Sequence, residues 1–293
     1  MLIYIPNSSE QTIGGGWRFI ENFKKGVNRL FPDVKFTNKL SRCDAMLIVS
    51  ASMTEPEEVE EAFNLNKGIV FRCDNIPKKS RNKRARIYDR MRRYGELADV
   101  VVFQSEWARE YAGYLVGDET GQVIYNGVDR EIFNLKDRDE FSDRKFLFVQ
   151  YNRDENKRWP EAAYDFHQRW KKNKEVRLTV VGNFSPDLIE ADFDFFDDEA
   201  VKYIPVLTSA EDMAEVYKIH DYLLFPAFAD AAPNTLMEAL ACGLKPLLLN
   251  DVGGTMEIYN RFKEGILPDI DDMTREYIGV LGLITGQYEH EQH

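Results

Sequence analysis

Short apolar runs alternate with helix-like patterns along the whole chain. Apolar runs bounded by turn residues predict buried strands, whereas apolar residues that recur every three or four positions predict the helices that cover them. One such helix is expected between the first two strands, and a proline ends it. Its apolar residues and the proline are Ile20, Phe23, Val27, Leu30 and Pro32. This alternation is typical of the α/β class, in which helices cover parallel sheets.

The predicted strands fall into two groups. The first group is expected at residues 2–5, 34–37, 45–50, 68–72, 99–103 and 122–125. The second group is expected at residues 145–151, 177–182, 201–204, 222–225 and 246–249. Between them, residues 135–144 contain seven charged residues in ten, which is typical of a linker. We therefore predict two doubly wound, Rossmann-like domains that face each other across a cleft, with ligands at the carboxyl ends of the strands.

Three local signals predict where helices begin and end. Thr54, with Glu57 three residues later, predicts a capped helix start, because each side chain can reach the backbone amide of the other. Ser209, with Asp212 three residues later, predicts a second capped start. Gly243 is expected to end a later helix in a left-handed conformation.

Length and composition limit the class of protein. A chain of 293 residues fits two domains of about 150 residues each. Its 44% hydrophobic and 30% charged residues are those of a folded, soluble protein. The sequence has no apolar run of about eighteen residues and no secretion signal at its start. Because Cys43, Cys73 and Cys242 have neither disulfide nor zinc-site spacing, we expect reduced thiols in a cytoplasmic protein.

The charge is distributed unevenly along the chain. The net charge of −12 argues against general nucleic-acid binding, which needs a basic face. The segment from Lys78 to Arg93 departs from this trend, with nine basic residues and one acid. Two interpretations stay open for it. The segment is either a solvated helix face or a contact for an anionic ligand, an acceptor or a membrane surface.

The segment from Phe225 to Gly243 carries the strongest candidate site. A strand is expected to end at Phe225, a loop follows, and a helix begins near Asn234. The first amides of a helix have no partner within it and lie at the positive end of its dipole, so they can hold a phosphate group. Glu238, one turn inside the helix, can accept hydrogen bonds from two sugar hydroxyls, and Asp230 lies eight residues earlier on the loop.

This segment resembles the acidic–seven–acidic motif of retaining GT-B glycosyltransferases, in particular of the large glycosyltransferase family 4, the group 1 glycosyl transferases. Residues 245–257 resemble the next strand of that family and its G-G-x-x-E turn. The resemblance implies that Glu238 binds the ribose of a nucleotide and that Asp230 binds a hydroxyl of the transferred sugar. It implies that the loop and helix start bind the diphosphate, through Pro233, Asn234 and Thr235. Asp230 stands where a glutamate is usual, which leaves the donor sugar open.

A second constellation follows the first strand of the second half. Arg153 and Lys157 come directly after this strand, near the predicted phosphate site. They resemble the R-x-x-x-K element of the family, which neutralises the diphosphate leaving group. A departing nucleotide diphosphate gains negative charge in the transition state, and fixed cations there lower the barrier. The resemblance implies catalysis without a bound metal, and the D-x-D spacing from Asp192 to Asp194 does not follow a predicted strand.

Two features of the first half add to the resemblance. Gly15 and Gly16 join the first strand to a helix and resemble the N-terminal glycine loop of the family, which closes over the donor phosphate or the acceptor. Asp74 follows the strand at 68–72 within an R-x-D-N sequence, which resembles a variant found in the family. Because no histidine occurs before His167, Asp74 is the candidate polar group beside the reacting sugar. His167 and His220 are expected to lie in helices, packed or exposed rather than catalytic.

The sequence therefore predicts a metal-independent, retaining GT-B glycosyltransferase that moves a sugar from a nucleotide-diphosphate donor to an acceptor hydroxyl. No cofactor is expected besides the donor. Residues 1–134 would form the acceptor domain and residues 145–270 the donor domain, with a helix in residues 271–293 that crosses back to the first. The acceptor stays open, whether glycan, lipid-linked or protein. Two alternatives also stay open: a non-catalytic sugar-nucleotide-binding protein on the same scaffold, and a nucleotide-sugar epimerase or phosphorylase.

Overall fold

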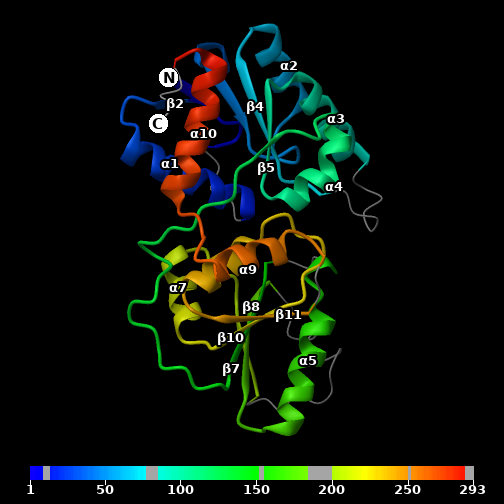
Figure 1. The fold of residues 1–293 in the computed structure, drawn as a ribbon, viewed down its shortest axis with the longest axis vertical. Helices are drawn as coiled ribbons and strands as arrows, with labels where there is room; N and C mark the ends of the chain where they lie inside the picture. Colours follow the sequence, from blue (N-terminus) through cyan, green and yellow to red (C-terminus); the bar gives the residue numbers. More distant parts are fainter. Residues whose placement is uncertain (9–13, 77–84, 152–154, 184–199, 250–251, 288–293) are drawn as a thin grey trace. The chain divides into compact units, whose positions relative to one another are not determined.

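The computed structural model describes residues 1–8, 14–76, 85–151, 155–183, 200–249 and 252–287. The chain divides into two compact units, one formed by Met1–Gly127 with Pro268–His293 and the other by Val128–Leu267. Each unit contains one parallel sheet with helices packed against it (Figure 1). The predicted α/β fold with two Rossmann-like domains is confirmed.

The first unit has a six-stranded sheet in the order β2-β1-β3-β4-β5-β6. Its strands are β1 Leu2–Tyr4, β2 Lys35–Thr37, β3 Ala45–Ile48, β4 Gly68–Cys73, β5 Val100–Phe103 and β6 Gln122–Val123. Every neighbouring pair in this order runs parallel. The carboxyl ends of the strands therefore meet at one edge, which is where open α/β sheets bind ligands.

Helices from both ends of the chain cover the first sheet. They are α1 Gly15–Leu30, α2 Pro56–Asn64, α3 Ala85–Leu97, α4 Glu106–Val116 and α10 Ile270–Thr285, with a short 3₁₀ turn η1 at Leu40–Arg42. Helix α10 lies beside α1 (Figure 1), where Tyr277 packs edge-on against Phe19 and Phe23 with ring centroids 5.1 and 5.8 Å apart. Gly26 of α1 allows this approach, because a Cβ there would lie 2.1 Å from the Thr274 Oγ1 atom.

The second unit has a five-stranded parallel sheet in the order β11-β10-β7-β8-β9. Its strands are β7 Lys145–Gln150, β8 Arg177–Gly182, β9 Val201–Ile204, β10 Tyr222–Phe225 and β11 Lys245–Leu248. The helices of this unit are η3 Glu155–Lys157, which is a 3₁₀ turn, α5 Trp159–Lys172, α7 Ala210–Lys218, α8 Asn234–Ala241 and α9 Thr255–Lys263.

The second sheet packs against an apolar layer on each face. Successive residues of a strand point to opposite faces, so Phe146 and Phe148 of β7 join one layer and Leu147 joins the other. Helix α5 packs Trp159 and Phe166 into the first layer. Helices α7, α8 and α9 pack against the opposite face. The loops at the carboxyl ends of the strands therefore extend from a sheet that packs against a hydrophobic core on both faces.

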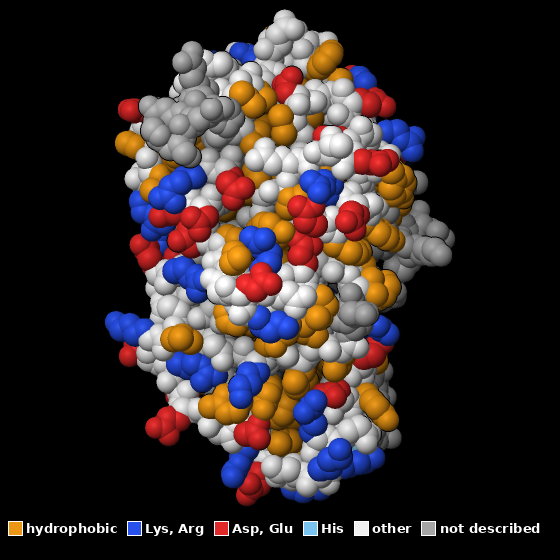
Figure 2. All heavy atoms as spheres, viewed as in Figure 1, with side chains coloured by type: hydrophobic (Ala, Val, Ile, Leu, Met, Phe, Trp, Pro, Cys, Tyr) orange, Lys and Arg blue, Asp and Glu red, His pale blue; other side chains and the backbone are white. Residues whose placement is uncertain are grey.

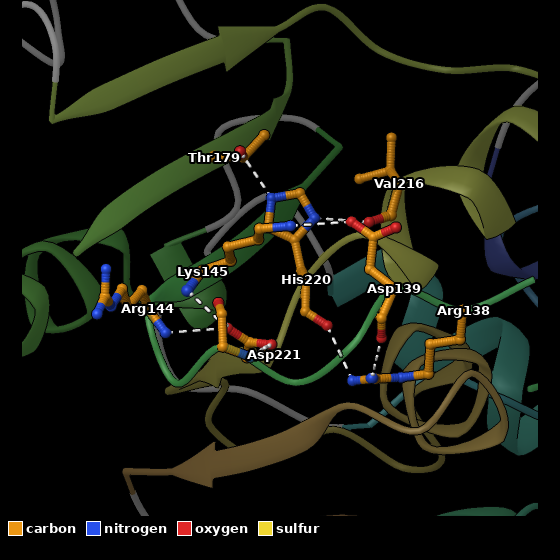
Figure 3. Close-up of polar contacts among 9 residues, drawn as sticks. Arg138, Asp139, Arg144, Lys145, Thr179, Val216, His220 and Asp221 are labelled. Atoms are coloured by element: carbon orange, nitrogen blue, oxygen red, sulfur yellow. Dashed lines mark hydrogen bonds and ion pairs between the residues drawn. The ribbon is translucent and has the colours of Figure 1, made fainter. Parts of the chain in front are cut away.

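A polar cluster at the amino ends of β7 and β10 holds residues 138–145 within the second unit (Figure 3). The Asp221 carboxylate, in a residue only 2% exposed, accepts four hydrogen bonds from this segment. The donors are the amides of Ser142, Arg144 and Lys145 and the Ser142 hydroxyl, at 2.7–3.0 Å. Arg138 donates to the carbonyls of His220 and Cys242. The buried carboxylate is stable there because hydrogen-bond donors replace the water that it loses on folding.

His220 belongs to the same cluster and corrects one expectation. The sequence pattern predicts His220 in a helix, but the residue lies in the turn between α7 and β10. Its ring nitrogens contact the Thr179 hydroxyl at 2.7 Å and the Val216 carbonyl at 2.6 Å (Figure 3). Burial lowers the pKa of His220, so the ring is a neutral, structural group.

The predicted strands all occur in the structure, with ends that differ by no more than two residues. Ser209 caps α7 by accepting from the Asp212 amide, and Gly243 is left-handed with φ of 81°, as predicted. The predicted cap at Thr54 is wrong. Helix α2 begins after Glu55 without a side-chain cap, and the Thr54 carbonyl instead accepts a hydrogen bond from the buried Tyr94 hydroxyl. Tertiary packing against α3 thus overrides the local capping signal.

Basic and acidic side chains are interspersed on the face shown in Figure 2. The described part of the basic segment lies on α3, where Arg90 pairs with Glu55 and Arg93 pairs with Glu60 at 3.2 Å. Residues 77–84 of this segment lie outside the described residues. Among the helices that the structure describes, none is long and apolar enough to span a bilayer.

Candidate functional site

The loop that follows β10 leads into the uncapped start of α8. Pro233 occupies the N-cap position, where its side chain has no oxygen to accept a hydrogen bond, and the first turn contains no acidic residue. The first amides of α8, at Asn234 and Thr235, therefore lie at the positive end of the helix, and the N-cap side chain does not cap them. This arrangement suits an anionic group such as a phosphate.

Lys157 and Asp230 form an ion pair beside this helix start. Lys157 ends the η3 turn after β7, and its Nζ atom lies 2.7 Å from Asp230 Oδ2. The two side chains are 27% and 24% exposed, so both can still reach solvent or a ligand. The amide of Phe228 donates to the carbonyl of Asn156 at 2.8 Å, which joins the two loops. A cation and a carboxylate that are 73 residues apart in sequence thus meet at one point.

The backbone on both sides of Asp230 is tightly held. Asp230 pairs with Gly253 in an isolated parallel bridge, and its carbonyl accepts from the Gly254 amide at 2.8 Å. Ala229 is left-handed with φ of 52°, an unusual conformation for a residue with a side chain. A Cβ at Gly253, whose φ is 115°, would lie 2.8 Å from both the amide nitrogen and the carbonyl oxygen of Asp230. The glycine therefore allows the loop after β11 to position Asp230.

We expect Gly253→Ala to lower the free energy of unfolding by about 2 kcal/mol or more, because it adds a steric clash to an unfavourable backbone conformation. Urea denaturation of purified protein measures this change. Gly265→Ala is the matched control, since Gly265 has φ of 81° but no atom within 4 Å of its Cβ position. Equal losses in the two variants would contradict the close approach to Asp230.

Glu238 lies one turn inside α8 and is anchored by a buried tyrosine. The Tyr217 hydroxyl donates to Glu238 Oε2 at 3.2 Å. Burial, together with the nearby Glu238 carboxylate, raises the pKa of Tyr217 well above its ordinary value, so the hydroxyl keeps its proton. Glu238 itself is half-buried. The tyrosine fixes the direction of a carboxylate that the sequence analysis assigns to ribose.

The first unit presents a second group of polar residues at the carboxyl edge of its sheet. Helix α1 begins at Gly15 after Gly14, with no side-chain cap and no acid in its first turn. Asp74 and Asn75 follow β4, and Asn75 Oδ1 accepts a hydrogen bond from the Ser50 hydroxyl at 3.1 Å. Burial raises the pKa of Asp74, against the opposing effect of the Arg72 charge.

Arg72, inside β4, is a buried cation, with only 2% of its surface exposed. It donates to the Val49 carbonyl at 3.0 Å, to Gln104 Oε1 at 2.7 Å and to Asn126 Oδ1 at 3.1 Å. The nearest Asp74 oxygen is 3.9 Å from its Nη1 atom. The guanidinium also lies 4.3 Å from the centre of the Phe19 ring. Arg72 thereby ties the ends of β3, β4 and β5 to residue 126, beyond β6.

The structure brings together some of the predicted residues. Lys157 and Asp230 are in direct contact, while Pro233, Asn234, Thr235 and Glu238 lie on the adjoining loop and helix of the same unit. Arg153 lies outside the described residues. Gly15, Gly16 and Asp74 lie in the first unit.

The hydrogen-bonded network around Arg72 and the contact of Tyr217 with Glu238 were not predicted from the sequence. The signal available for Arg72 was a charged residue inside the apolar run of β4. No comparable signal marked Gln104 as its partner.

Two further features of the second unit bear on ligands. No group of three or more potential metal ligands occurs among the described residues. A pocket of about 510 Å³ lies beside the start of α5 and contains none of the predicted donor-binding residues. It is lined by Arg158, Pro160, Glu161, Tyr164, Asp165, Gln168, Pro226 and Leu249.

Most of the second unit and most of α10 match a known family model. Residues 144–282 match the family described as "Glycosyl transferases group 1". This part of the chain is similar to the group 1 glycosyl transferases. The matched residues include the Lys157–Asp230 pair and Glu238. A comparison with curated protein sequences gave no match.

Solved structures are similar to nearly the whole chain, beyond the residues that match the family model. Anabaena HepE in complex with UDP and glucose matches with a TM-score of 0.63 and 12% identity, over 98% of this chain and 92% of HepE. Sucrose-phosphate synthase from Thermosynechococcus elongatus matches with a TM-score of 0.62 and 13% identity, over 98% and 96% of the two chains. MnaA of S. aureus in a co-structure with UDP gives a TM-score of 0.59 and 13% identity, over 98% and 89%. Together with the two parallel-sheet units, these similarities show the GT-B fold.

Proposed function

We propose that this protein transfers a sugar from a nucleotide-diphosphate donor to an acceptor hydroxyl with retention of configuration. The observation that carries the proposal is the Lys157–Asp230 pair beside the uncapped start of α8, within the residues that match the group 1 family model. A cation and the first amides of a helix suit a diphosphate, and the adjoining carboxylates suit sugar and ribose hydroxyls. HepE, which shares the fold, was crystallised with UDP-glucose. We therefore take UDP-glucose as the first donor to test.

Each donor-binding residue has a distinct part in the proposed reaction. The amides of Asn234 and Thr235, with Pro233 before them, hold the diphosphate, and Lys157 neutralises it. Asp230 accepts a hydrogen bond from a hydroxyl of the sugar. Glu238, held by the Tyr217 hydroxyl, accepts hydrogen bonds from the ribose. Binding would exchange part of the Lys157–Asp230 contact for contacts with the donor, so that the two side chains hold its adjacent parts.

Charge stabilisation of the leaving group is the proposed main catalytic effect. The bond between the anomeric carbon and the diphosphate oxygen breaks as the acceptor oxygen attacks from the same face, and the diphosphate takes up the proton of the acceptor hydroxyl. The negative charge on the diphosphate grows during this step, so a fixed ammonium and fixed amides bind the transition state more tightly than the ground state. We assign the same role to Arg153 and propose that the reaction needs no metal.

We assign acceptor binding to residues 1–134 and donor binding to residues 145–270, and we take the helix within residues 271–293 as the one that crosses back to the first domain. Asp74, at the carboxyl edge of the first sheet, would contact the reacting sugar, and Gly15 and Gly16 would approach the donor phosphate or the acceptor. We place the protein in the cytoplasm, with the segment from Lys78 to Arg93 as a contact for an anionic ligand or a membrane surface.

Thermal-shift and product assays test this function. A ligand that binds only the folded protein raises its stability, by about 2.7 kcal/mol when present at a hundred times its Kd. We expect UDP and UDP-glucose to raise the unfolding temperature and inorganic phosphate at the same concentration to leave it unchanged. Release of UDP from UDP-glucose in the presence of an acceptor would then establish transfer. Absence of a shift across uridine, guanosine and adenosine diphosphates would contradict the proposal.

A further inference from the structure

Helix α4 carries an aromatic stripe formed by Trp107, Tyr111 and Tyr114. Tyr111 is 45% exposed and Tyr114 is 64% exposed, while Trp107 is half-buried. At 100° per residue these three positions fall within an arc of roughly 60°, and they extend over about 10 Å of the helix. The small residues that α4 buries against its unit lie on the opposite face. They are Ala108, Ala112, Gly113 and Val116.

The aromatic stripe is an ordered surface. The rings of Trp107 and Tyr111 stack with their centroids 4.9 Å apart and their planes 12° from parallel. Ser105 fixes the helix start by accepting from the Ala108 amide at 3.1 Å. Side chains that are already held in one orientation lose little conformational entropy when a ligand binds. A contiguous exposed aromatic surface of this kind is typical of a binding site.

The charges beside the aromatic stripe select its ligand. Glu106 and Glu110 are exposed on the same helix, and the single cation of α4, Arg109, pairs with Glu106. On α4 itself the exposed charges beside the rings are acidic, which disfavours contact of this helix with an anionic membrane. Glutamate is depleted at the centres of protein interfaces, which argues against a protein partner. Exposed carboxylates and tyrosine hydroxyls instead suit a neutral ligand that is rich in hydroxyl groups.

The position of α4 links the aromatic stripe to the proposed acceptor side. Helix α4 begins directly after β5 (Figure 1). Trp107, the second residue of the helix, therefore lies near the carboxyl edge of the sheet, the edge at which Asp74 follows β4. From there the stripe continues along α4, away from that edge. A polymer whose end reached the edge could therefore continue along the helix.

We propose that the aromatic stripe is a subsite for a neutral oligosaccharide or polysaccharide, the acceptor of the proposed transferase. Sugar rings carry C–H groups on one face, which pack against aromatic rings, while their hydroxyls donate to carboxylates at the rim. The length of the stripe exceeds a single sugar ring, so the acceptor is a glycan of several residues. The assignment of this glycan as the acceptor rests on the proposed function. Glycan binding itself can be measured without a donor.

Affinity electrophoresis in native gels tests the subsite. The probes are dextran, amylopectin and galactomannan, all neutral and soluble. We expect at least one to retard the full-length protein, and we expect Y111A/Y114A to bind that polysaccharide about tenfold or more weakly, because each aromatic contact contributes measurably to binding. Tyr164→Ala is the matched control, since Tyr164 is 61% exposed on α5 in the other unit.

The outcomes separate this inference from the proposed function. The UDP-induced thermal shift of Y111A/Y114A should equal that of the unaltered protein, which also shows that the variant is folded. Lack of retardation by all three polysaccharides would overturn the inference, as would equal retardation of Y111A/Y114A and the unaltered protein. If the protein bound no polysaccharide but sedimented with phosphatidylserine vesicles, and Y111A/Y114A did not, the aromatic stripe would be a membrane contact instead. Failure of the proposed function would show as loss of the UDP shift in every form of the protein.

Discussion

Lys157→Ala is expected to lower turnover with a nucleotide-sugar donor by about a hundredfold or more. The variant removes a fixed positive charge from the proposed diphosphate site, and loss of one such preorganised group costs on the order of a hundredfold or more in rate. Stability should fall by only about 1 kcal/mol or less, because the Lys157–Asp230 pair is partly exposed. Steady-state kinetics with saturating donor, together with urea denaturation, measure the two effects.

Lys172→Ala provides the control for this experiment. Lys172 is an exposed lysine of the same unit, in the last turn of α5. Its removal changes the net charge as the Lys157 variant does, but at a different place. Turnover should stay within about twofold, since exposed substitutions away from special features have small effects. Equal activity in the two variants would remove Lys157 from the proposed mechanism.

Asp221→Ala is expected to lower the free energy of unfolding by about 3 kcal/mol or more. The variant leaves the amides of Ser142, Arg144 and Lys145 without their acceptor, and a buried unsatisfied donor costs about 1–3 kcal/mol. Urea denaturation near neutral pH measures the loss. Asp139→Ala is the control from the same cluster, because Asp139 is half exposed and pairs with Lys145 at 2.9 Å. The control should lose about 1 kcal/mol or less.

The effect of Asp221 also depends on pH. Burial opposes ionisation, but the Ser142 hydroxyl and the three amides outweigh it and lower the pKa of Asp221 in the folded protein. Because the pKa is lower in the folded protein, the stabilisation is complete above the pKa of the unfolded chain, which is about 4. The stabilisation is lost as the pH falls through the pKa of the folded protein. The difference in stability between the unaltered protein and Asp221→Asn should therefore shrink below about pH 4. A constant difference down to about pH 2 would contradict this account.

The ion pair between Lys157 and Asp230 has a consequence for the proposed binding of a donor. Before a donor binds, each charge has the other as partner, so neither is left buried without compensation. The resemblance assigned the two residues to different parts of the donor, and the structure shows that their side chains are already adjacent. This adjacency suits a ligand in which a negative diphosphate is joined directly to a hydroxyl-rich ring.

The strand pattern could be predicted from the sequence because its physical basis is local. Strands that are buried on both faces must be continuous apolar runs, and helices that cover them must repeat every three to four residues. Gly243 and the Ser209 cap were predictable for the same reason, since a left-handed turn and an N-cap depend on neighbouring residues. Thr54 shows the limit of local signals, because the hydroxyl of Tyr94, forty residues away in sequence, bonds the Thr54 carbonyl where a cap was expected.

The sequence by itself determined the α/β class and the two groups of strands, and it predicted the segments that carry the candidate site residues. Only the tertiary structure decided which side chains meet. It paired Lys157 with Asp230, anchored Glu238 through Tyr217 and surrounded Arg72 with Gln104 and Asn126. The physical reason is that secondary structure follows from periodicity within a few turns, whereas contacts between loops depend on strand order and on the packing of helices across the sheet. The sequence pattern does not specify those distances, and the folded chain does.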